Sequence, residues 1–111
     1  MWAPQHPNIL TSQLTLDEPQ QNLCVRISTD VAGESAAKVY GPAFPRDDGP
    51  EIFSLSLGNP KENCGVLTKQ QVKDLKAGLL YVLIKTGAFP NGEIRGQILP
   101  VGKGLLYKVP D

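Results

Sequence analysis

The chain has 111 residues, with eleven basic and eleven acidic side chains and a formal net charge of zero. This length suits one domain with one hydrophobic core and is too short for two domains of ordinary size. The balanced charge gives no electrostatic footprint for a nucleic acid or an anionic membrane, so we expect neither as a partner. The longest apolar run, Leu79 to Ile84, has the length of a strand and cannot insert into a membrane.

Glycine and proline punctuate the whole chain, with eleven and ten copies, and the segments between them alternate or form short apolar runs. This pattern is typical of an all-β domain with many turns. In chain order it predicts strands over 9–16, 23–28, 36–40, 52–57, 79–85 and 93–99. We expect the first two to form a hairpin and the last two to form the centre of the fold. Strands at this spacing favour an immunoglobulin-like Greek-key β-sandwich or barrel.

One short helix is predicted over about 68–77. Thr68 and Gln71 have the spacing of a capping box, in which each side chain accepts the other residue's backbone N–H. Val72 and Leu75 lie three residues apart, on one helix face, and Gly78 suits a left-handed helix end.

The two cysteines, Cys24 and Cys64, are too far apart for a C-x-x-C redox or zinc motif. They form either one disulfide or two buried thiols. A disulfide would close a loop of about 40 residues and stabilise the chain by about 3 to 4 kcal/mol in the chain-entropy model. Such a bond would favour an oxidising compartment.

Few residues offer chemistry for catalysis. The single histidine, His6, lies near the start of the chain, where we expect a solvated side chain and no ligand or base. Asp47 and Asp48, with Glu51 nearby, suggest a calcium loop, but they lack the alternating oxygen ligands of an EF-hand. We expect these carboxylates to be solvated, and we predict no catalytic residue, no metal and no cofactor.

The segment Gly92-Glu93-Ile94-Arg95-Gly96 places a carboxylate and a guanidinium on one face of a predicted strand. Catalysis would need a cleft and a third group, and neither is identifiable. The structural interpretation is simpler, because an arginine fork can bind loop carbonyls or a carboxylate and attach a long connection to the sheet. We therefore assign a structural role to Gly92, Glu93, Arg95 and Gly96.

The run "LKAGLLYVLIKTGAFPNGEIRGQI" resembles the C-terminal half of the chordin-type (CHRD) domain, whose pattern is L-x-A-G-x-L-Y-V-N-I-H-T, a short loop and then G-E-I-R-G-Q. "SAAKVYGPA" is similar to that family's A-A-H-I-H-G-P-A segment, and "GPEIFSLSLG" to its G-P-V-V-F-x-L. The resemblance covers about residues 11–99. It implies an exported immunoglobulin-like β-domain distantly similar to the Cu,Zn superoxide dismutase fold.

The family's histidine positions are replaced in this chain. Its H-I-H falls on Lys38, Val39 and Tyr40, and the histidine of N-I-H-T falls on Lys85. Copper and zinc bind neutral imidazole nitrogens, whereas a protonated ammonium has no lone pair and repels the ion. A metal-binding or dismutase-like function is therefore not expected.

Two interpretations of the replaced positions stay open. In the first, strand pairing draws four residues together into a small cationic pocket, which would bind a carboxylate, a sulfate or an acidic side chain of a partner. These residues are Lys38, Tyr40, Lys85 and Arg95. Alternatively, they are solvated edge residues whose stems cover apolar surface.

The ends of the chain suggest a role in protein interaction. The family begins with a strand of the type L-S-G-x-x-E-V-P-P, which residues 1–8 hardly supply, and a missing strand would expose a sheet edge. The tail carries Leu105, Leu106 and Tyr107, which would fold back over that edge or dock on a partner. Residues 1–4 do not resemble a secretory signal, so we expect that any signal was removed before the chain begins.

We therefore expect an N-terminal segment (1–10), a CHRD-like β-domain (11–100) and a C-terminal tail (101–111). The predicted function is a non-enzymatic protein-interaction or structural module, secreted or otherwise extracytoplasmic, that is a subunit of a larger assembly. Small-anion binding is the alternative.

Overall fold

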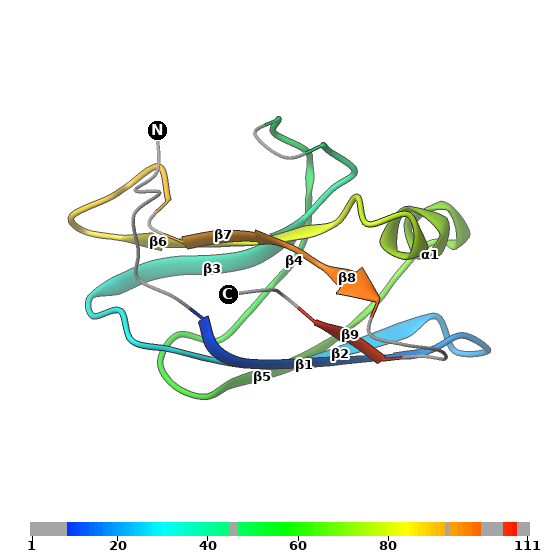
Figure 1. Cartoon of the computed structure of the whole chain (residues 1–111), viewed down its shortest axis with the longest axis horizontal. Helices are drawn as coiled ribbons and strands as arrows, with labels where there is room; N and C mark the ends of the chain where they lie inside the picture. The colour runs from blue at the N-terminus through cyan, green and yellow to red at the C-terminus, as the bar shows by residue number, and fades with distance from the viewer. Residues whose placement is uncertain (1–8, 45–46, 93, 101–105, 109–111) are drawn as a thin grey trace.

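Two antiparallel sheets face each other and form a β-sandwich (Figure 1). The structure is a computed structural model that describes residues 9–44, 47–92, 94–100 and 106–108. Sheet A has the strand order β5 (Lys61–Val66), β2 (Asn22–Thr29), β1 (Ile9–Asp17), β9 (Leu106–Lys108) and β8 (Leu99–Pro100). Sheet B has the order β4 (Glu51–Ser54), β3 (Glu34–Tyr40), β6 (Tyr81–Thr86) and β7 (Ile94–Gln97).

The strand order is that of an immunoglobulin-like sandwich. β2 lies between β1 and β5 in one sheet, while β3 lies between β4 and β6 in the other, so the chain alternates between the two layers. The predicted all-β fold class is confirmed, as is the β1–β2 hairpin. The expectation that both of the last two predicted strands lie at the centre was wrong, because β6 is central while β7 is an edge strand.

The core fills the space between the sheets and follows the period of two that the sequence predicts. Leu14 and Leu16 of β1 point inward, as do alternate residues of β2, β3 and β6. Residues at these positions are almost fully buried: Leu23, Val25, Ile27, Ala37, Val39, Val82 and Ile84. The intervening residues of the same strands therefore form the outer faces of the sandwich.

The predicted helix is present as α1 (Lys69–Lys76), which lies at one end of the sandwich (Figure 1). Its capping box is complete, because Thr68 Oγ1 accepts the N–H of Gln71 (3.0 Å) and Gln71 Oε1 accepts the N–H of Thr68 (2.8 Å). Val72 and Leu75 are buried against the core. Gly78 follows with a φ of +77°, as a left-handed helix end requires. Within the described residues, no helix is long and apolar enough to cross a membrane.

Three strands were not predicted as separate elements: β5, β8 and β9. The predicted strand 93–99 is divided in the structure, because β7 ends at Gln97 in sheet B and Leu99 begins β8 in sheet A. The inward positions of β5 are occupied by Lys61, Asn63 and Gly65, so that strand has no alternating apolar residues to reveal it. β9 is only three residues long and pairs with both β1 and β8.

The predicted tail contributes β9 to sheet A, which corrects part of its assignment to partner docking. Tyr107 lies opposite Leu14 of β1 and is only 4% exposed, so it belongs to the core of this chain. Leu106 pairs with Thr15 in the same ladder. Of the two outcomes left open for the tail, folding back beside β1 is the one observed for residues 106–108. Leu105 and residues 1–8 lie outside the described residues.

Candidate functional site

The four candidate contact residues all lie on the outer face of sheet B. Strand register places Lys38, Leu83 and Arg95 in one row across β3, β6 and β7. Tyr40 lies one row further along, beside Tyr81, and Lys85 lies one row in the other direction. Neighbouring strands are about 4.8 Å apart, so Lys38 and Arg95 are separated by about 10 Å at the backbone. The four residues therefore share one face of sheet B but stand in three different rows.

Arg95 lies beneath the connection between β3 and β4, here called the 41–50 loop, which rises from sheet B on the side away from sheet A (Figure 1). Its Nη2 donates to the carbonyl of Phe44 (3.2 Å) and to the carbonyl of Asp47. Its Nη1 lies 3.5 Å from Asp48 Oδ1, and the arginine side chain is only 6% exposed. These contacts attach the loop to sheet B, and they leave little of the guanidinium open to a free anion.

Tyr81 is the residue of this site that the sequence analysis missed. Although it points outward from sheet B, it is only 1% exposed, because the loop covers it. Its ring stacks on Tyr40 with centroids 5.3 Å apart, and the Arg95 guanidinium carbon lies 3.8 Å from its centroid. Its hydroxyl accepts the N–H of Gly49 (2.9 Å). The signal was present in the alternation of β6, which puts Tyr81 on the same face as Lys85.

The start of the 41–50 loop is also attached by hydrogen bonds, in addition to the contacts of Arg95. Gln97 Nε2 donates to the carbonyls of Ala43 (3.2 Å) and Gly78 (2.9 Å), and the N–H of Ala43 donates to the Leu79 carbonyl (2.9 Å). Gly41 has a φ of +149°, and a Cβ there would lie 2.8 Å from the Leu79 carbonyl oxygen. Only glycine permits this close approach. The described part of the loop is therefore held at both ends by hydrogen bonds to β6, β7 and the α1–β6 connection.

Phe44 stands out in the described part of this loop because its side chain is exposed to solvent. It is 66% exposed, the largest exposed fraction of any described aromatic residue. Beside it is an open groove of about 640 Å³, lined by Pro42, Ala43, Phe44, Leu79, Asp47 and Asp48. The groove thus combines apolar walls with two exposed carboxylates.

Lys38 is already paired within the chain. Its Nζ lies 2.8 Å from Glu51 Oε1, and this hydrogen bond, with the charge of the carboxylate, raises the lysine pKa above its usual value. Burial raises the pKa of the neighbouring Tyr40 hydroxyl, so this phenol stays protonated at neutral pH. Lys85 lies beside Ala36 and is half-buried. Of these two lysines, Lys38 therefore has a salt bridge, whereas Lys85 has none to a carboxylate among the described residues.

The remaining candidate residues have local structural contacts. Gly92 closes the β6–β7 turn by donating its N–H to the Phe89 carbonyl (3.0 Å), and Gly96 lies opposite Val82 in the sheet B ladder. Glu93 and His6 lie outside the described residues. Asp48 is directed toward Arg95, and Glu51 toward Lys38. Among the described residues, no group of three histidine, cysteine, aspartate or glutamate side chains is placed to hold a metal ion.

Replacing Arg95 with lysine is expected to release the 41–50 loop, because an ammonium cannot span two carbonyls and stack on Tyr81 as a planar guanidinium does. We expect the free energy of unfolding in urea to fall by about 1.5 to 3 kcal/mol. Hydrogen exchange of the Gly49 amide should also become faster. The matched control is Arg26→Lys, at an exposed side chain on the outer face of sheet A, which should change stability by less than about 0.5 kcal/mol. Unchanged Gly49 exchange in the Arg95 variant would contradict the attachment.

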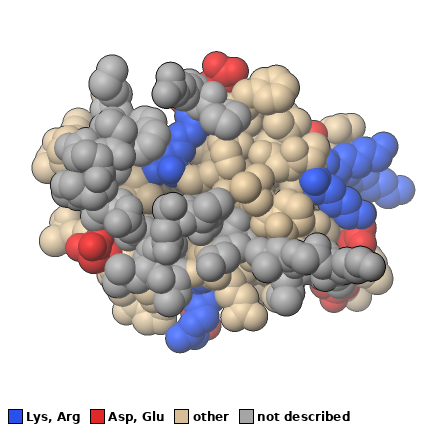
Figure 2. All heavy atoms as spheres, in the orientation of Figure 1, with Lys and Arg blue, Asp and Glu red and all other residues tan. Residues whose placement is uncertain are grey.

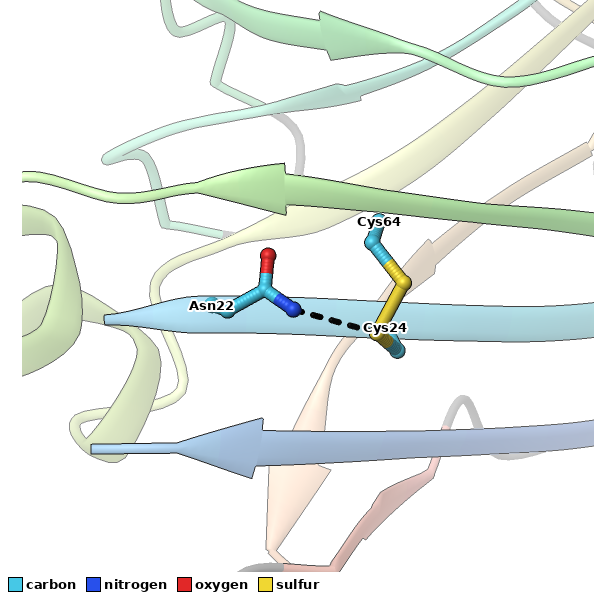
Figure 3. Close-up of a disulfide and its surroundings, with 3 residues drawn as sticks. All are labelled: Asn22, Cys24 and Cys64. Carbon is cyan, nitrogen blue, oxygen red and sulfur yellow. Dashed lines mark hydrogen bonds between the residues drawn. A yellow bond between two sulfur atoms is a disulfide. The ribbon is translucent and has the colours of Figure 1, made fainter. Parts of the chain in front are cut away.

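The two cysteines form a disulfide across β2 and β5 of sheet A (Figure 3). Cys24 and Cys64 are directly opposed in the ladder, with Cα atoms 4.0 Å apart. This resolves the choice between one bridge and two buried thiols. Disulfides persist in oxidising compartments and are rare in the cytosol.

Together these features define an immunoglobulin-like β-sandwich with a 41–50 loop whose described part is hydrogen-bonded to sheet B and exposes Phe44. The family model of the CHRD domain matches residues 11–98, so the chain belongs to the CHRD domain family. The match includes the Arg95 motif, both cysteines and the 41–50 loop. Comparisons with curated proteins and with solved structures found no match.

Proposed function

We propose that this chain is a non-catalytic protein-interaction module of an exported assembly, and that Phe44 and its groove are the contact surface. The observation that carries the proposal is the combination of a 66% exposed phenylalanine with a backbone fixed beneath it by Arg95. If a loop lacks such contacts, it must be ordered when a partner binds, and the entropy cost of that ordering offsets much of the binding free energy of an exposed aromatic residue. Here the sheet has already ordered the described part of the loop.

The chemistry of the groove indicates the kind of partner. Its described walls are apolar except for Asp47 and Asp48, and Asp48 has a side chain that is 96% exposed. A protein segment that places an apolar side chain next to a lysine or arginine would match both features. Aromatic anchors of this kind carry most of the energy of many interfaces, whereas a charged rim sets specificity and salt dependence.

Export and the absence of catalysis are part of the same proposal. The Cys24–Cys64 bridge and membership of the CHRD family support an extracytoplasmic location. The lysines at positions 38 and 85 stand where the resembling family pattern has histidines, which supports a role without metal chemistry. Binding of a small anion near Lys38, Tyr40 and Lys85 is the alternative function, and it gains little support because Glu51 already neutralises Lys38.

A displayed library of random peptides, selected on the folded protein, tests the groove. We expect the selected peptides to carry a large apolar residue beside a basic one, and to bind the Phe44→Ser variant about tenfold or more weakly. The double variant Asp47→Asn, Asp48→Asn should bind the selected peptides more weakly, and its affinity for them should depend much less on salt concentration. Leu57→Ser is the matched control, since it removes another exposed apolar side chain (53% exposed) remote in sequence from the groove.

Two results would overturn the proposal. The first is selected peptides that bind the Phe44→Ser variant as tightly as the original chain. The second is sedimentation showing a dimer that dissociates in this variant, because the occupant of the groove would then be a second copy of the chain.

A further inference from the structure

The Cys24–Cys64 disulfide lies on the open outer face of sheet A. The neighbouring residues Leu23 and Val25 point into the core, so both bridging sulfurs are on the opposite side of the strand from it. Cys64 is exposed and Cys24 is half-buried. Figure 3 shows the bond passing directly from β2 to β5. The bridge is therefore accessible to a reagent without any opening of the core.

The two sulfurs differ in how they can be approached. A thiolate attacks a disulfide along the line of the S–S bond, from the side opposite the leaving sulfur. Among the described residues, β5 is the edge strand of sheet A, so an attack on Cys64 arrives from beyond that edge. An attack on Cys24 would have to arrive over β1, where Thr15 is the residue opposite Cys24. Access thus favours Cys64 as the sulfur attacked.

Asn22 favours Cys24 as the leaving sulfur. Its side-chain Nδ2 donates a hydrogen bond to Cys24 Sγ at 3.4 Å, drawn as the dashed line in Figure 3. A donor aimed at a sulfur stabilises the thiolate over the thiol, and a better leaving thiolate speeds exchange. The next row on the other side of the bridge is the Arg26–Glu62 salt bridge, whose two charges compensate each other. The arrangement is therefore asymmetric, with an open sulfur and a hydrogen-bonded one.

The strands hold the reduced thiols together. β2 and β5 remain registered through residues on both sides of the bridge, from the pair Asn22 and Val66 to the pair Ile27 and Lys61. After cleavage the two cysteines would stay opposite each other on this ladder. The bond can therefore reform without a search for its partner.

We propose that this bridge is a thiol–disulfide exchange site for a small monothiol. The thiolate of the monothiol forms a bond to Cys64 Sγ, the Cys24–Cys64 bond breaks, and its electron pair leaves with Cys24 as a thiolate that accepts the Asn22 hydrogen bond. In the reverse step, Cys24 attacks Cys64 Sγ in the mixed disulfide and expels the monothiol. No net oxidation or reduction occurs. The site is on the sheet opposite the Phe44 groove, so it does not rest on the proposed function.

The test incubates the native protein with reduced glutathione and traps free thiols with iodoacetamide at intervals. Peptide mass spectrometry then locates glutathione and the alkyl label. We expect glutathione on Cys64 and the alkyl label on Cys24 in a ratio of about ten to one or more. The rate should not rise with urea below the unfolding transition, as expected for a reaction of the native state. Glutathione mainly on Cys24, or a rate that rises with urea in proportion to the unfolded fraction, would overturn the proposal.

Asn22 variants test the leaving sulfur. Asn22→Ala should slow the first exchange step by about threefold to tenfold, and Asn22→Asp should slow it further, because a carboxylate repels the departing thiolate. Thr15→Ala is the matched control on the same face and should exchange at the original rate. Unchanged rates in both Asn22 variants, with the native fold confirmed by circular dichroism, would contradict the role assigned to Asn22.

Discussion

Replacing Lys61 with methionine is expected to lower the free energy of unfolding by about 3 to 5 kcal/mol. Lys61 is fully buried on the inward face of β5, and its Nζ lies 2.8 Å from Glu34 Oε1 of β3. It also donates to the Gly58 carbonyl (2.7 Å). Methionine fills the space of the stem but leaves the Glu34 carboxylate, whose side chain is 5% exposed, without its counterion. The measurement is urea unfolding followed by fluorescence or circular dichroism.

The pair matters because it connects the two layers at one end of the sandwich. Glu34 also accepts hydrogen bonds from the Gly58 N–H (3.3 Å) and the Thr29 hydroxyl (3.5 Å). One carboxylate thus contacts β2, β5 and the turn before β5. Removing either charge alone leaves buried polar groups unsatisfied, whereas removing both charges together avoids most of this penalty. We expect the double variant Lys61→Met, Glu34→Gln to recover most of the lost stability.

The chain offers a matched control one residue further along β5, where Glu62 pairs with Arg26 of β2. Arg26 and Glu62 form a salt bridge on the outer face of sheet A, with side chains 58% and 59% exposed. Arg26→Met should cost less than about 1 kcal/mol, since exposed pairs are solvated and screened by salt. If the Lys61 and Arg26 variants lost similar stability, burial would not be the source of the effect.

Removing the disulfide by the double substitution Cys24→Ala, Cys64→Ala is expected to lower the free energy of unfolding by about 4 kcal/mol. The bridge joins residues 40 apart in sequence. A closed loop of that length removes about 4 kcal/mol of chain entropy from the unfolded state in the loop-closure model. Domains of this size are stable by only about 5 to 15 kcal/mol, so the loss would be a large fraction of the total.

The folded structure should change little in this variant. The β2–β5 ladder is held by backbone pairing on both sides of the bridge, and neither sulfur packs in the core. We therefore expect an unchanged circular dichroism spectrum at low urea together with a lower unfolding midpoint. Reduction of the original chain should give the same shift. A double variant as stable as the original, with the same dependence on urea, would show that the bridge does not constrain the unfolded chain.

The sequence predicted the elements whose signals are local. Alternation of apolar residues located β1 and β2, and short apolar runs located β3 and β6, each to within a few residues. The Thr68–Gln71 capping box located α1. The Arg95 motif was interpreted as a loop attachment, and in the structure the Arg95 guanidinium donates to the carbonyls of Phe44 and Asp47. Each of these signals depends on neighbouring residues or on one short motif, which a single sequence contains in full.

The elements that were missed depend on partners far away in the chain. β5 carries Lys61 at an inward position. In the sequence alone a lysine there indicates a loop, because a strand position facing the core is expected to be apolar. Only the fold shows that Glu34 of β3 neutralises this lysine. Inward-pointing charges are one way in which edge strands avoid pairing with other chains. β9 is too short for a periodic signal, and only its pairing with β1 and β8 makes it a strand. Tyr81 belongs to the site because the 41–50 loop packs over it and Gly49 hydrogen-bonds its hydroxyl, a contact between residues 32 apart in the sequence.

The sequence by itself thus determined the all-β class, the helix and the family pattern. It did so because side-chain periodicity and motif spacing are properties of contiguous residues. Only the tertiary structure decided that Cys24 and Cys64 face outward, that Lys61 is neutralised by Glu34 and that Phe44 is exposed above a fixed backbone. These features depend on how two sheets and a long loop pack together, and that arrangement is set by the whole core.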